Sequence, residues 1–240
     1  PPAIATQLVP THITCQGSGL DNGSVDLTVT GGISPYSYGW SNGSSTEDIS
    51  GLTAGTYSVT VTDSNGCSAA DSVRVNLPPP LTYSQNLSDY NGYNISCYGM
   101  SNGSIGVDLT SGTAPFVYSW QGPGGFTAST KDISGLESGQ YILLVTDKNM
   151  CSVLDTINLS QPQKLDMNIN TSISLTGDHN INCAGSKSGS ILVEALNNAG
   201  PVTYLWADGE IGSSRNNLAA GSYKIIITDS NNCQADSIIT

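Results

Sequence analysis

The fold is decided by the stretch Gly55-Thr-Tyr57-Ser-Val-Thr-Val-Thr-Asp63-Ser-Asn65-Gly-Cys67. In it Tyr57, Val59 and Val61 alternate with polar residues, and a period of two is typical of a strand that buries one face. The Asp-Ser-Asn-Gly run that follows is rich in turn-forming residues. The stretch therefore predicts a half-buried strand that ends in a tight turn just before a cysteine.

The same pattern occurs twice more, ending at Cys151 and at Cys233, with the consensus G-x-Y-x-ϕ-x-ϕ-T-D-x-N-x-C in which ϕ is aliphatic. An earlier cysteine precedes each copy, at Cys15, Cys97 and Cys183. These first cysteines are 82 and 86 residues apart (97 − 15 and 183 − 97). Repetition at this period predicts a tandem array of small domains.

Within each repeat, turn signals separate many short alternating stretches. Residues 24–30 alternate strictly, with Val25, Leu27 and Val29 on one face. Short strands with turns at this density predict an all-β fold of six or seven strands per repeat, arranged as an Ig-like antiparallel β-sandwich. Proline-containing linkers separate the repeats, so we expect three domains at 1–79, 80–162 and 163–240. The initial Pro-Pro resembles the tail of another such linker, and we expect the array to be part of a longer one.

Two kinds of aromatic residue recur at fixed places and are expected to form the framework of each core. A tryptophan follows each first cysteine, and a tyrosine follows a Leu-x-x-Gly-x pattern that resembles a tyrosine corner. The framework residues are Trp40, Trp120, Trp206, Tyr57, Tyr141 and Tyr223. In immunoglobulin domains the corner tyrosine stands two residues before the second cysteine, but here it stands ten before (67 − 57). We therefore expect an Ig-like architecture without the immunoglobulin cysteine geometry.

Six cysteines in three equivalent pairs predict one disulfide inside each domain, because that pairing gives every repeat the same structure. Six cysteines allow 15 connectivities, and no C-x-x-C spacing favours a metal site. The expected intradomain bridges are Cys15–Cys67, Cys97–Cys151 and Cys183–Cys233. Oxidised cysteines would place the chain outside the cytoplasm.

The Asp and Asn of the D-x-N-x-C turn have a structural and a metal-binding interpretation. Asp63 can accept hydrogen bonds from amides of its own turn, and we expect Asn65, Asn149 and Asn231 in the left-handed conformation that asparagine tolerates. Asp-x-Asn also begins many calcium loops, but a full loop needs six or more oxygens, and no later acidic residue completes one here. The structural interpretation is favoured. Ca²⁺ stays the alternative, and no metal ligand or other cofactor is assigned.

The composition argues against several functions. A net charge of −12 disfavours nucleic acid and anionic lipid, which are bound mainly by clustered Lys and Arg. No run of about 18 apolar residues predicts a membrane span, so direct membrane insertion is not expected. His12 and His179 stand alone, and no catalytic motif occurs. We expect no catalytic residues and no enzyme in this segment.

Read together, the elements C-x-G, N-G-S, P-Y/F-x-Y-x-W and D-I-S-G-L-x-x-G-x-Y closely resemble SprB-type repeats. Repeat 1 carries them at residues 35–40 and 48–52, and repeat 2 at 115–120 and 132–136. Repeat 3 keeps the first of these two at 201–206 but has Asn-Asn-Leu at 216–218 in place of the D-I-S-G-L run. The resemblance covers nearly the whole chain.

SprB-type repeats occur in very large cell-surface adhesins of gliding Bacteroidota. The resemblance implies type IX secretion, an extracellular surface location and a role in attachment or gliding motility, with this segment as a structural stalk or spacer. The implied partners are neighbouring repeats of the same long chain, and surface polysaccharide or other surface proteins as further candidates. The alternative is a carbohydrate-binding module, for which Phe126 in the repeat-2 insertion is the best candidate. An accessory region of a secreted hydrolase would need a catalytic domain outside this segment.

That phylum also implies O-glycosylation at Asp-Ser/Thr followed by an aliphatic residue. Such triplets occur shortly after each second cysteine, and the candidate acceptors are Ser72, Thr156 and Ser237. The alternative is an alternating last strand without sugar, because a three-residue motif often matches by chance.

Overall fold

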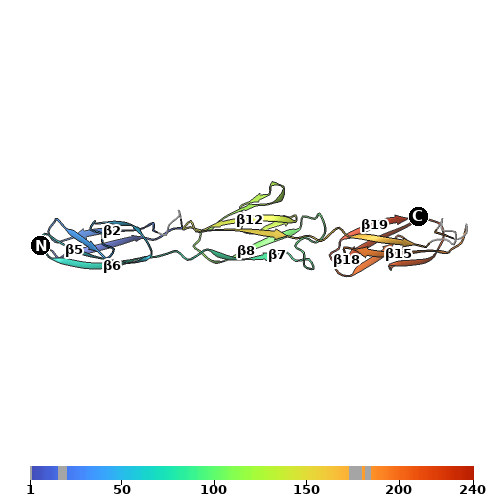
Figure 1. Ribbon diagram of the computed structural model, residues 1–240, viewed down its shortest axis with the longest axis horizontal. Coiled ribbons are helices and arrows are strands. Elements are labelled where there is room, and N and C mark those ends of the chain that lie inside the picture. The colour runs from blue at the N-terminus through green and yellow to red at the C-terminus, as the bar shows by residue number, and fades with distance from the viewer. Residues whose placement is uncertain (1, 16–20, 173–179, 182–184) are drawn as a thin grey trace. The chain divides into compact units, whose positions relative to one another are not determined.

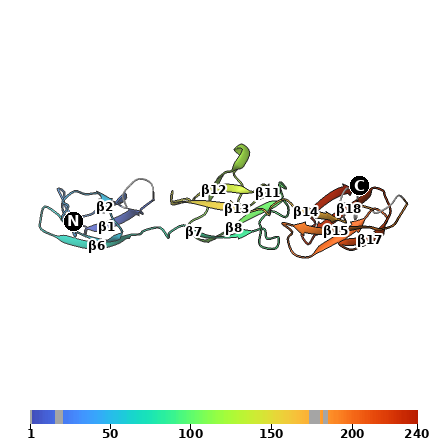
Figure 2. The ribbon, with the colours of Figure 1, turned by 45° about the vertical axis from the view of Figure 1, so that its right-hand side comes forward.

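The computed structural model describes residues 2–15, 21–172, 180–181 and 185–240. In this part of the chain the regular structure is antiparallel strands and one short 3-10 turn, η1 (Pro123–Gly125). Figures 1 and 2 show the strands in three groups, coloured blue to cyan, green to yellow and orange to red. The all-β prediction is confirmed. The described residues contain no helix long and apolar enough to cross a membrane.

Repeat 1 forms two three-stranded sheets, one with the order β1-β2-β4 and the other with the order β3-β5-β6. The strands are β1 (Ala5–Thr11), β2 (Gly23–Thr30), β3 (Ser37–Trp40), β4 (Ile49–Leu52), β5 (Gly55–Thr62) and β6 (Ser68–Val75). Side chains of both sheets meet in one buried cluster, with Val25 and Leu27 from one sheet and Trp40 and Val59 from the other. The repeat is therefore a β-sandwich.

Repeats 2 and 3 use the same plan. Repeat 2 has the sheets β11-β8-β7 and β10-β9-β12-β13, and repeat 3 has β14-β15-β17 and β16-β18-β19. The repeat-2 strands are β7 (Thr82–Leu87), β8 (Gly103–Ser111), β9 (Val117–Gln121), β10 (Thr127–Ala128), β11 (Ile133–Leu136), β12 (Gly139–Thr146) and β13 (Ser152–Leu159). Those of repeat 3 are β14 (Asp166–Thr171), β15 (Gly189–Leu196), β16 (Val202–Trp206), β17 (Ser214–Leu218), β18 (Tyr223–Asp229) and β19 (Gln234–Ile239).

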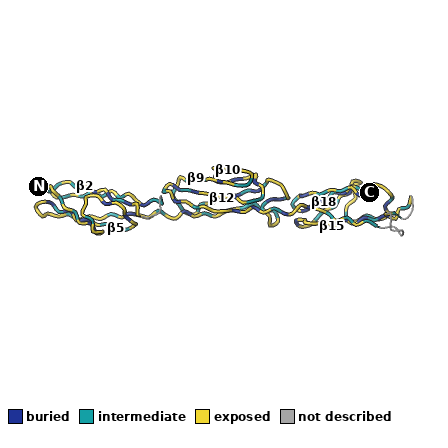
Figure 3. The backbone as a smooth tube through the Cα atoms, turned by 45° about the horizontal axis from the view of Figure 1, so that its top comes forward, coloured by how far each residue is buried: buried dark blue, intermediate teal, exposed yellow. Residues whose placement is uncertain are grey.

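The alternation read from the sequence matches the burial of the strands. On β2, Val25 and Leu27 are buried and Val29 is half-buried, while on β5 Val59 and Val61 are buried. Figure 3 shows this alternation as dark and light stretches along the strands. A period of two thus gave the correct buried face.

By its contacts the chain forms two compact units. One combines residues 1–84, 108–119 and 143–155, and the other combines 85–107, 120–142 and 156–240. The division falls inside strands of repeat 2, so it does not follow the repeat length. The domain boundaries expected at 79/80 and 162/163 stay predictions.

The β5–β6 hairpin has two ends, and the cysteines of repeat 1 lie at opposite ones. Thr62 pairs with Ser68 beside the turn that contains Cys67, and Gly55 pairs with Val75 at the far end. The amide of Ile13, two residues before Cys15, donates to the carbonyl of Asn76 at 3.1 Å, just past that far end. A strand of this length spans roughly 23 Å, so Cys15 and Cys67 are well separated.

Candidate functional site: the cysteine junctions between repeats

Each disulfide that the structure describes joins two consecutive repeats. Cys15 is bonded to Cys151 with a Cα–Cα distance of 4.6 Å, and Cys97 to Cys233 with 5.5 Å. In both cases the first cysteine of one repeat meets the second cysteine of the next, at the same sequence separation of 136. The predicted intradomain bridges Cys15–Cys67 and Cys97–Cys151 are therefore wrong.

The physical reason is distance. A disulfide needs Cα atoms within about 7 Å, and the two cysteines of a repeat lie at opposite ends of one sandwich. Consecutive repeats instead bring the first-cysteine segment of one to the hairpin turn of the next. One signal in the sequence favoured the observed pairing. The first cysteine of a repeat and the second cysteine of the next are 136 residues apart in both cases, whereas the two cysteines within a repeat are 52 residues apart in repeat 1 (67 − 15) and 54 in repeat 2 (151 − 97).

Two cysteines remain outside these bridges. Cys67 is a free, exposed thiol. Cys183, like His179, lies outside the described residues. The predicted bridge Cys183–Cys233 is nevertheless wrong, because Cys233 is bonded to Cys97.

A buried aspartate organises each D-x-N-x-C turn. One oxygen of Asp63 accepts the amides of Asn65 and Cys67 at 3.0 and 2.9 Å, and the other accepts the amide of Ile33 at 3.1 Å. Burial by itself raises the pKa of Asp63, but the hydrogen bonds from Cys67, Ile33 and Asn65 outweigh it and lower the pKa below its usual value.

The same three amide contacts recur in the other repeats. Asp147 accepts the amides of Asn149, Cys151 and Thr113 at 2.8 to 3.0 Å. Asp229 accepts those of Asn231, Cys233 and Ala199 at 2.9 to 3.0 Å. The aspartates thus serve the turn itself, and the described residues contain no group of three or more His, Cys, Asp or Glu placed to bind a metal ion.

The left-handed residue of each turn is not the predicted asparagine but the residue after it. Gly66, Met150 and Asn232 have φ values of 82°, 62° and 63°. The amide of Gly66 donates to the carbonyl of Asp63 at 3.0 Å. A three-residue hairpin loop of this kind places its left-handed residue last, which explains the shift by one.

At the first junction, the backbone of repeat 1 bonds to the turn of repeat 2. The amide of Cys15 donates to the carbonyl of Asn149 at 2.8 Å. The Asn149 side chain donates in turn to the hydroxyl of Thr113 at 2.9 Å, and Cys151 is buried. The disulfide is thus supported by a hydrogen bond between the repeats.

At the second junction, a side chain makes the equivalent connection. Asn231 Nδ2 donates to the carbonyls of Tyr90 and Ser96 at 3.2 and 3.1 Å. Cys97 packs against the core of repeat 3, to which Cys233 belongs. The second bridge is therefore part of a hydrophobic core as well as a covalent link.

The asparagines of the N-G-S motif, which the sequence did not mark as functional, shape the first-cysteine segments. Asn22 exchanges two hydrogen bonds with the backbone of Thr14, both at 3.0 Å. Asn102 accepts the amide of Ser96 at 3.2 Å and donates to its hydroxyl at 2.6 Å. Thr14 and Ser96, which these asparagines hold, each directly precede a bridged cysteine, so the motif positions the disulfide.

The comparisons with known proteins agree with this repeating plan. The SprB repeat family model matches residues 9–45, 93–125 and 179–210, each of which runs from before a first cysteine to beyond the following tryptophan. This chain carries three SprB repeats. The D-x-N-x-C turns at 63–67, 147–151 and 229–233 lie outside the matched segments. A search of curated proteins finds no match.

Several solved structures match the chain at low identity and low TM-score. A chain of the complex of Dpr2 Ig1-Ig2 with DIP-Theta Ig1-Ig3 is 11% identical, with 100% of this chain and 99% of that chain covered and a TM-score of 0.34. Domains 4-9 of the surface layer protein SbsC are 10% identical (98% and 46% covered, TM-score 0.29). A tetra-tandem repeat from the extending region of a large adhesion protein is 13% identical (98% and 73% covered, TM-score 0.25). At these TM-scores they carry no argument about function.

The framework aromatics of the SprB repeats are similarly placed in all three. The indole N–H of Trp40, Trp120 and Trp206 donates to the carbonyls of Thr46, Thr130 and Gly212 at 2.9 to 3.0 Å. The hydroxyl of Tyr57, Tyr141 and Tyr223 donates to the carbonyl four residues earlier at 2.8 to 3.0 Å. All three repeats therefore contain the tyrosine corner.

The glycosylation candidates are not equivalent. In repeat 1 the last residue of the triplet, Val73, pairs with the corner tyrosine Tyr57. In repeat 3 the corner tyrosine Tyr223 pairs with Ile239, the residue after the triplet. The third triplet is thus shifted by one residue. As a result Ser72 and Thr156 are exposed, while Ser237 is half-buried.

The triplet aspartates of repeats 1 and 2 have structural partners. Asp71 accepts the hydroxyl of Thr6 at 3.1 Å, and Asp155 accepts that of Tyr83 at 2.5 Å. Both contacts join the first strand of a SprB repeat to its last. They explain the two aspartates without a sugar, and glycosylation stays a prediction.

The proposed sugar-binding aromatic is part of the framework instead. Phe126 is half-buried, and its ring meets that of Tyr141 edge-on at 5.6 Å. His12 lies on the surface, where its Nδ1 accepts the amide of Asn76 at 3.3 Å. Neither residue faces a reactive cluster.

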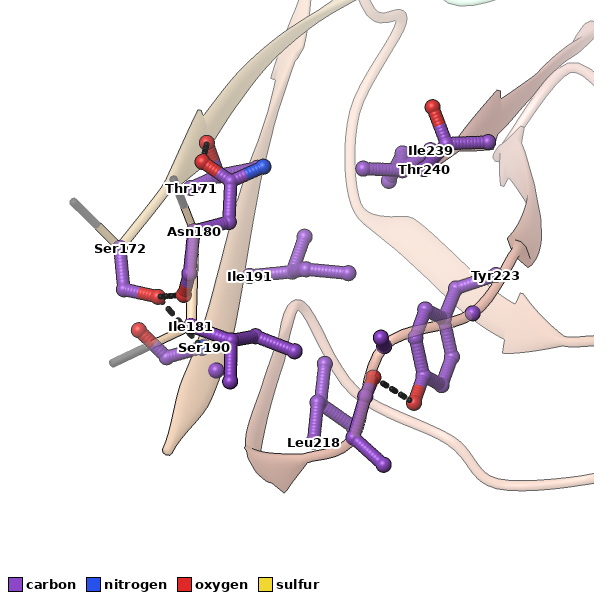
Figure 4. Close-up of a pocket in the computed structure, with 14 residues that line it drawn as sticks. Thr171, Ser172, Asn180, Ile181, Ser190, Ile191, Leu218, Tyr223, Ile239 and Thr240 are labelled. Carbon is purple, nitrogen blue, oxygen red and sulfur yellow. Dashed lines mark hydrogen bonds between the residues drawn. The ribbon is translucent and has the colours of Figure 1, made fainter. Parts of the chain in front are cut away.

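A cavity of ≈ 50 Å³ lies in repeat 3 between Ile181, Leu218 and Tyr223 (Figure 4). In repeats 1 and 2 the matching glycines, Gly23 and Gly103, face Val75 and Leu159 at this place. Both of these side chains are buried in their repeats. The cavity of repeat 3 therefore lies at a position that core side chains fill in repeats 1 and 2.

Proposed function

We propose that this chain is a tension-resistant spacer segment of a large repetitive cell-surface adhesin that serves attachment or gliding of the cell. The observation that carries the proposal is the pair of disulfides that cross the repeat boundaries. The SprB repeats support a surface location, and disulfides are typical of proteins outside the cytoplasm. A net charge of −12 helps to keep a long array soluble. The proposal gives the segment a structural role and no reaction.

The bridges define a short covalent path through the chain. Tension applied at the two ends passes from residue 15 to 151, back along residues 151–97, and across to 233. Residues 16–96 and 152–232 lie off this path. Fully extended, the path measures roughly 270 Å, against roughly 840 Å for the chain without bridges, at about 3.5 Å per residue.

The linkers are among the bypassed residues. The two segments between the last strand of one SprB repeat and the first of the next, 76–81 and 160–165, lie parallel to a disulfide, so neither segment is the sole connection that bears the load when both bridges are closed. Bridges inside each repeat would have the opposite effect, because every linker would then carry the whole load. An adhesin that must not be cut or stretched at its linkers gains from the observed connectivity.

Single-molecule stretching of the full chain from its two ends tests the proposal. We expect the oxidised chain to stop extending at roughly one third of the length reached after reduction. A Cys67→Ser variant is the matched control and should behave like the parent, since Cys67 is free. An oxidised chain that extends as far as the reduced one would disprove the tension-resistant role.

Cutting a linker gives a second, simpler readout. A protease site placed between Pro79 and Pro80 should leave one band on a non-reducing gel after cleavage, because Cys15–Cys151 still joins the two fragments. The same cut in a Cys15→Ser variant should release two fragments. Release of both fragments from the oxidised parent would contradict the proposal.

Carbohydrate binding remains the alternative function, now at a different place. Tyr98 and Met100 are exposed beside a groove of ≈ 300 Å³ at the second junction, with Lys164 on its rim. An exposed aromatic ring beside such a groove offers a face on which a sugar ring can pack. Glycan-array binding that is lost in Tyr98→Ala would support this function. Absence of binding would exclude it in favour of the spacer role.

A further inference from the structure

We propose that the turn of repeat 1 that contains Cys67 is a docking site for the first-cysteine segment of another SprB repeat, closed by a disulfide to Cys67. The proposal goes beyond the tension-resistant role, which depends only on the two bridges already described. It commits to one occupant, a segment with the chemistry of Ile13-Thr14-Cys15 and Ile95-Ser96-Cys97.

The turn of repeat 1 is built like the two turns that are already occupied. Asp63 makes the same three amide contacts as Asp147 and Asp229, so the backbone around Cys67 has the same internal support. Cys151 and Cys233 at the equivalent position are each bonded to a first cysteine. Because two of the three turns bind a first-cysteine segment, we expect the turn of repeat 1 to bind a segment of the same kind.

The difference between the turns lies in what covers them. Cys151 and Cys233 are 4% and 7% exposed, and Asn149 and Asn231 are half-buried beneath the preceding repeat. Cys67 and Asn65 are exposed. The surface that consecutive repeats bury at the two junctions is thus uncovered on repeat 1.

The second junction shows which side-chain contact to expect. There Asn231 donates to the carbonyl of Ser96, the residue before the bridged cysteine, whereas at the first junction the Asn149 side chain bonds to Thr113 and only its carbonyl meets the incoming segment. The position of Thr113 is isoleucine (Ile33) in repeat 1 and alanine (Ala199) in repeat 3, so Asn65 has the surroundings of Asn231. Asn65 offers the same amide to an incoming segment. The two thiols lose two protons and two electrons when the S–S bond forms, and a disulfide oxidant such as oxidised glutathione takes them up and becomes two thiols.

A four-repeat chain tests the inference. A second copy of residues 78–161 is placed directly before Pro1. In the native chain, the last strand of repeat 2 ends at Leu159 and the first strand of repeat 3 begins seven residues later, at Asp166. The insertion gives the same spacing between the copied Leu159 and Ala5, where the first strand of repeat 1 begins. After oxidation in a glutathione buffer, peptide mapping should find the copied first cysteine bonded to Cys67. The bridges Cys15–Cys151 and Cys97–Cys233 should persist and show that the chain has folded. A free Cys67 beside intact native bridges would overturn the proposal.

Two variants separate docking from chance oxidation. Asn65→Ala should lower the yield of the new bridge several-fold at a fixed glutathione ratio, while the matched control Asn158→Ala, on the exposed face of β13, should not. With the copied first cysteine changed to serine, alkylation of Cys67 should still slow at least tenfold relative to the 240-residue chain. Unchanged alkylation would contradict docking.

If the four-repeat chain does not fold, the segment is supplied in trans. A peptide of residues 93–102, which contains Cys97 with its Asn102 contact, is incubated with the native chain and compared with a scrambled peptide. We expect at least a tenfold excess of the mixed disulfide with Cys67 for the native order. Equal yields from the two peptides would overturn the proposal, whereas the stretching results for the native bridges would stand.

Discussion

Cys15 and Cys151 lie 4.6 Å apart at their Cα atoms although 136 residues separate them in sequence. The ring that they close overlaps the ring closed by Cys97 and Cys233, and residues 97–151 belong to both. In the chain-entropy model, closing one ring of this size stabilises the folded state by about 5 kcal/mol. Repeat 2 is therefore the most constrained part of the chain, and its neighbours are stabilised through it.

A pair of cysteine variants distinguishes this connectivity from bridges inside repeats. Cys15→Ser should leave Cys151 as a free thiol and lower the unfolding midpoint, because one ring of the unfolded chain is opened. Cys67→Ser should change neither the thiol count at Cys15 nor the midpoint. Thiol labelling with peptide mapping and thermal unfolding measure both effects. The appearance of a free Cys15 thiol in Cys67→Ser would contradict the structure.

Asn231 should protect the second bridge. Asn231→Ala leaves the carbonyls of Tyr90 and Ser96 without this donor, and we expect a loss of about 1 to 3 kcal/mol at the junction. Reduction of Cys97–Cys233 by a dithiol should accelerate at least several-fold. Reduction of Cys15–Cys151 in the same molecule is the internal control, and equal acceleration of both bridges would argue against a local effect.

Repeat 1 should lose stability in acid through Asp63. Its pKa is lower in the folded chain than its usual value of about 3.9. The stabilisation from the ionised carboxylate is therefore complete above that usual value and is lost as the pH falls through the folded pKa. Unfolding midpoints between pH 6 and pH 2, on the parent and on Asp63→Asn, should converge at the acid end. Parallel curves over the whole range would count against this role.

The three tyrosine corners should differ in strength. Tyr141 is 1% exposed, whereas Tyr57 and Tyr223 are half-buried. Tyr141→Phe removes the hydrogen bond of an almost fully buried ring to the carbonyl of Glu137 and should cost about 0.5 to 1.5 kcal/mol. Tyr57→Phe should cost less, because the hydrogen bond of Tyr57 to Thr53 is exposed to water. Denaturant unfolding of the two variants gives the order, and a larger loss for Tyr57→Phe would show that burial does not decide it.

Glycosylation, if present, should follow exposure and not the triplet alone. We expect added hexose on Ser72 and Thr156 in protein from its native source, and little or none on Ser237, which is half-buried on a shifted strand. Intact mass followed by peptide mapping makes the comparison. Protein without added mass would refute the sugar prediction, and equal occupancy at all three sites would refute the role of exposure.

Much of the local structure follows directly from the sequence. The alternation of Val25 with Leu27 and of Val59 with Val61 predicted which faces are buried, because a strand turns every second side chain to the same side. The Leu-x-x-Gly-x-Tyr pattern predicted the corner bond of Tyr57 to Thr53, since both partners lie on one loop and strand. Local hydrogen bonds of Asp63 also followed from turn chemistry.

The cysteine pairing was decided only by tertiary structure. The sequence showed that Cys15 and Cys67 belong to one repeat, but not that the β5–β6 hairpin carries them to opposite ends of it. A disulfide depends on distance in space, and the distance between two ends of a sandwich is set by strand length and pairing. The one-residue shift of the third triplet was already present in the sequence, because Asp71 follows Cys67 by four residues and Asp236 follows Cys233 by three. Only the strand register showed that this shift leaves Ser237 half-buried. The sequence by itself determined the SprB repeat and its framework, and the fold determined which repeats are joined.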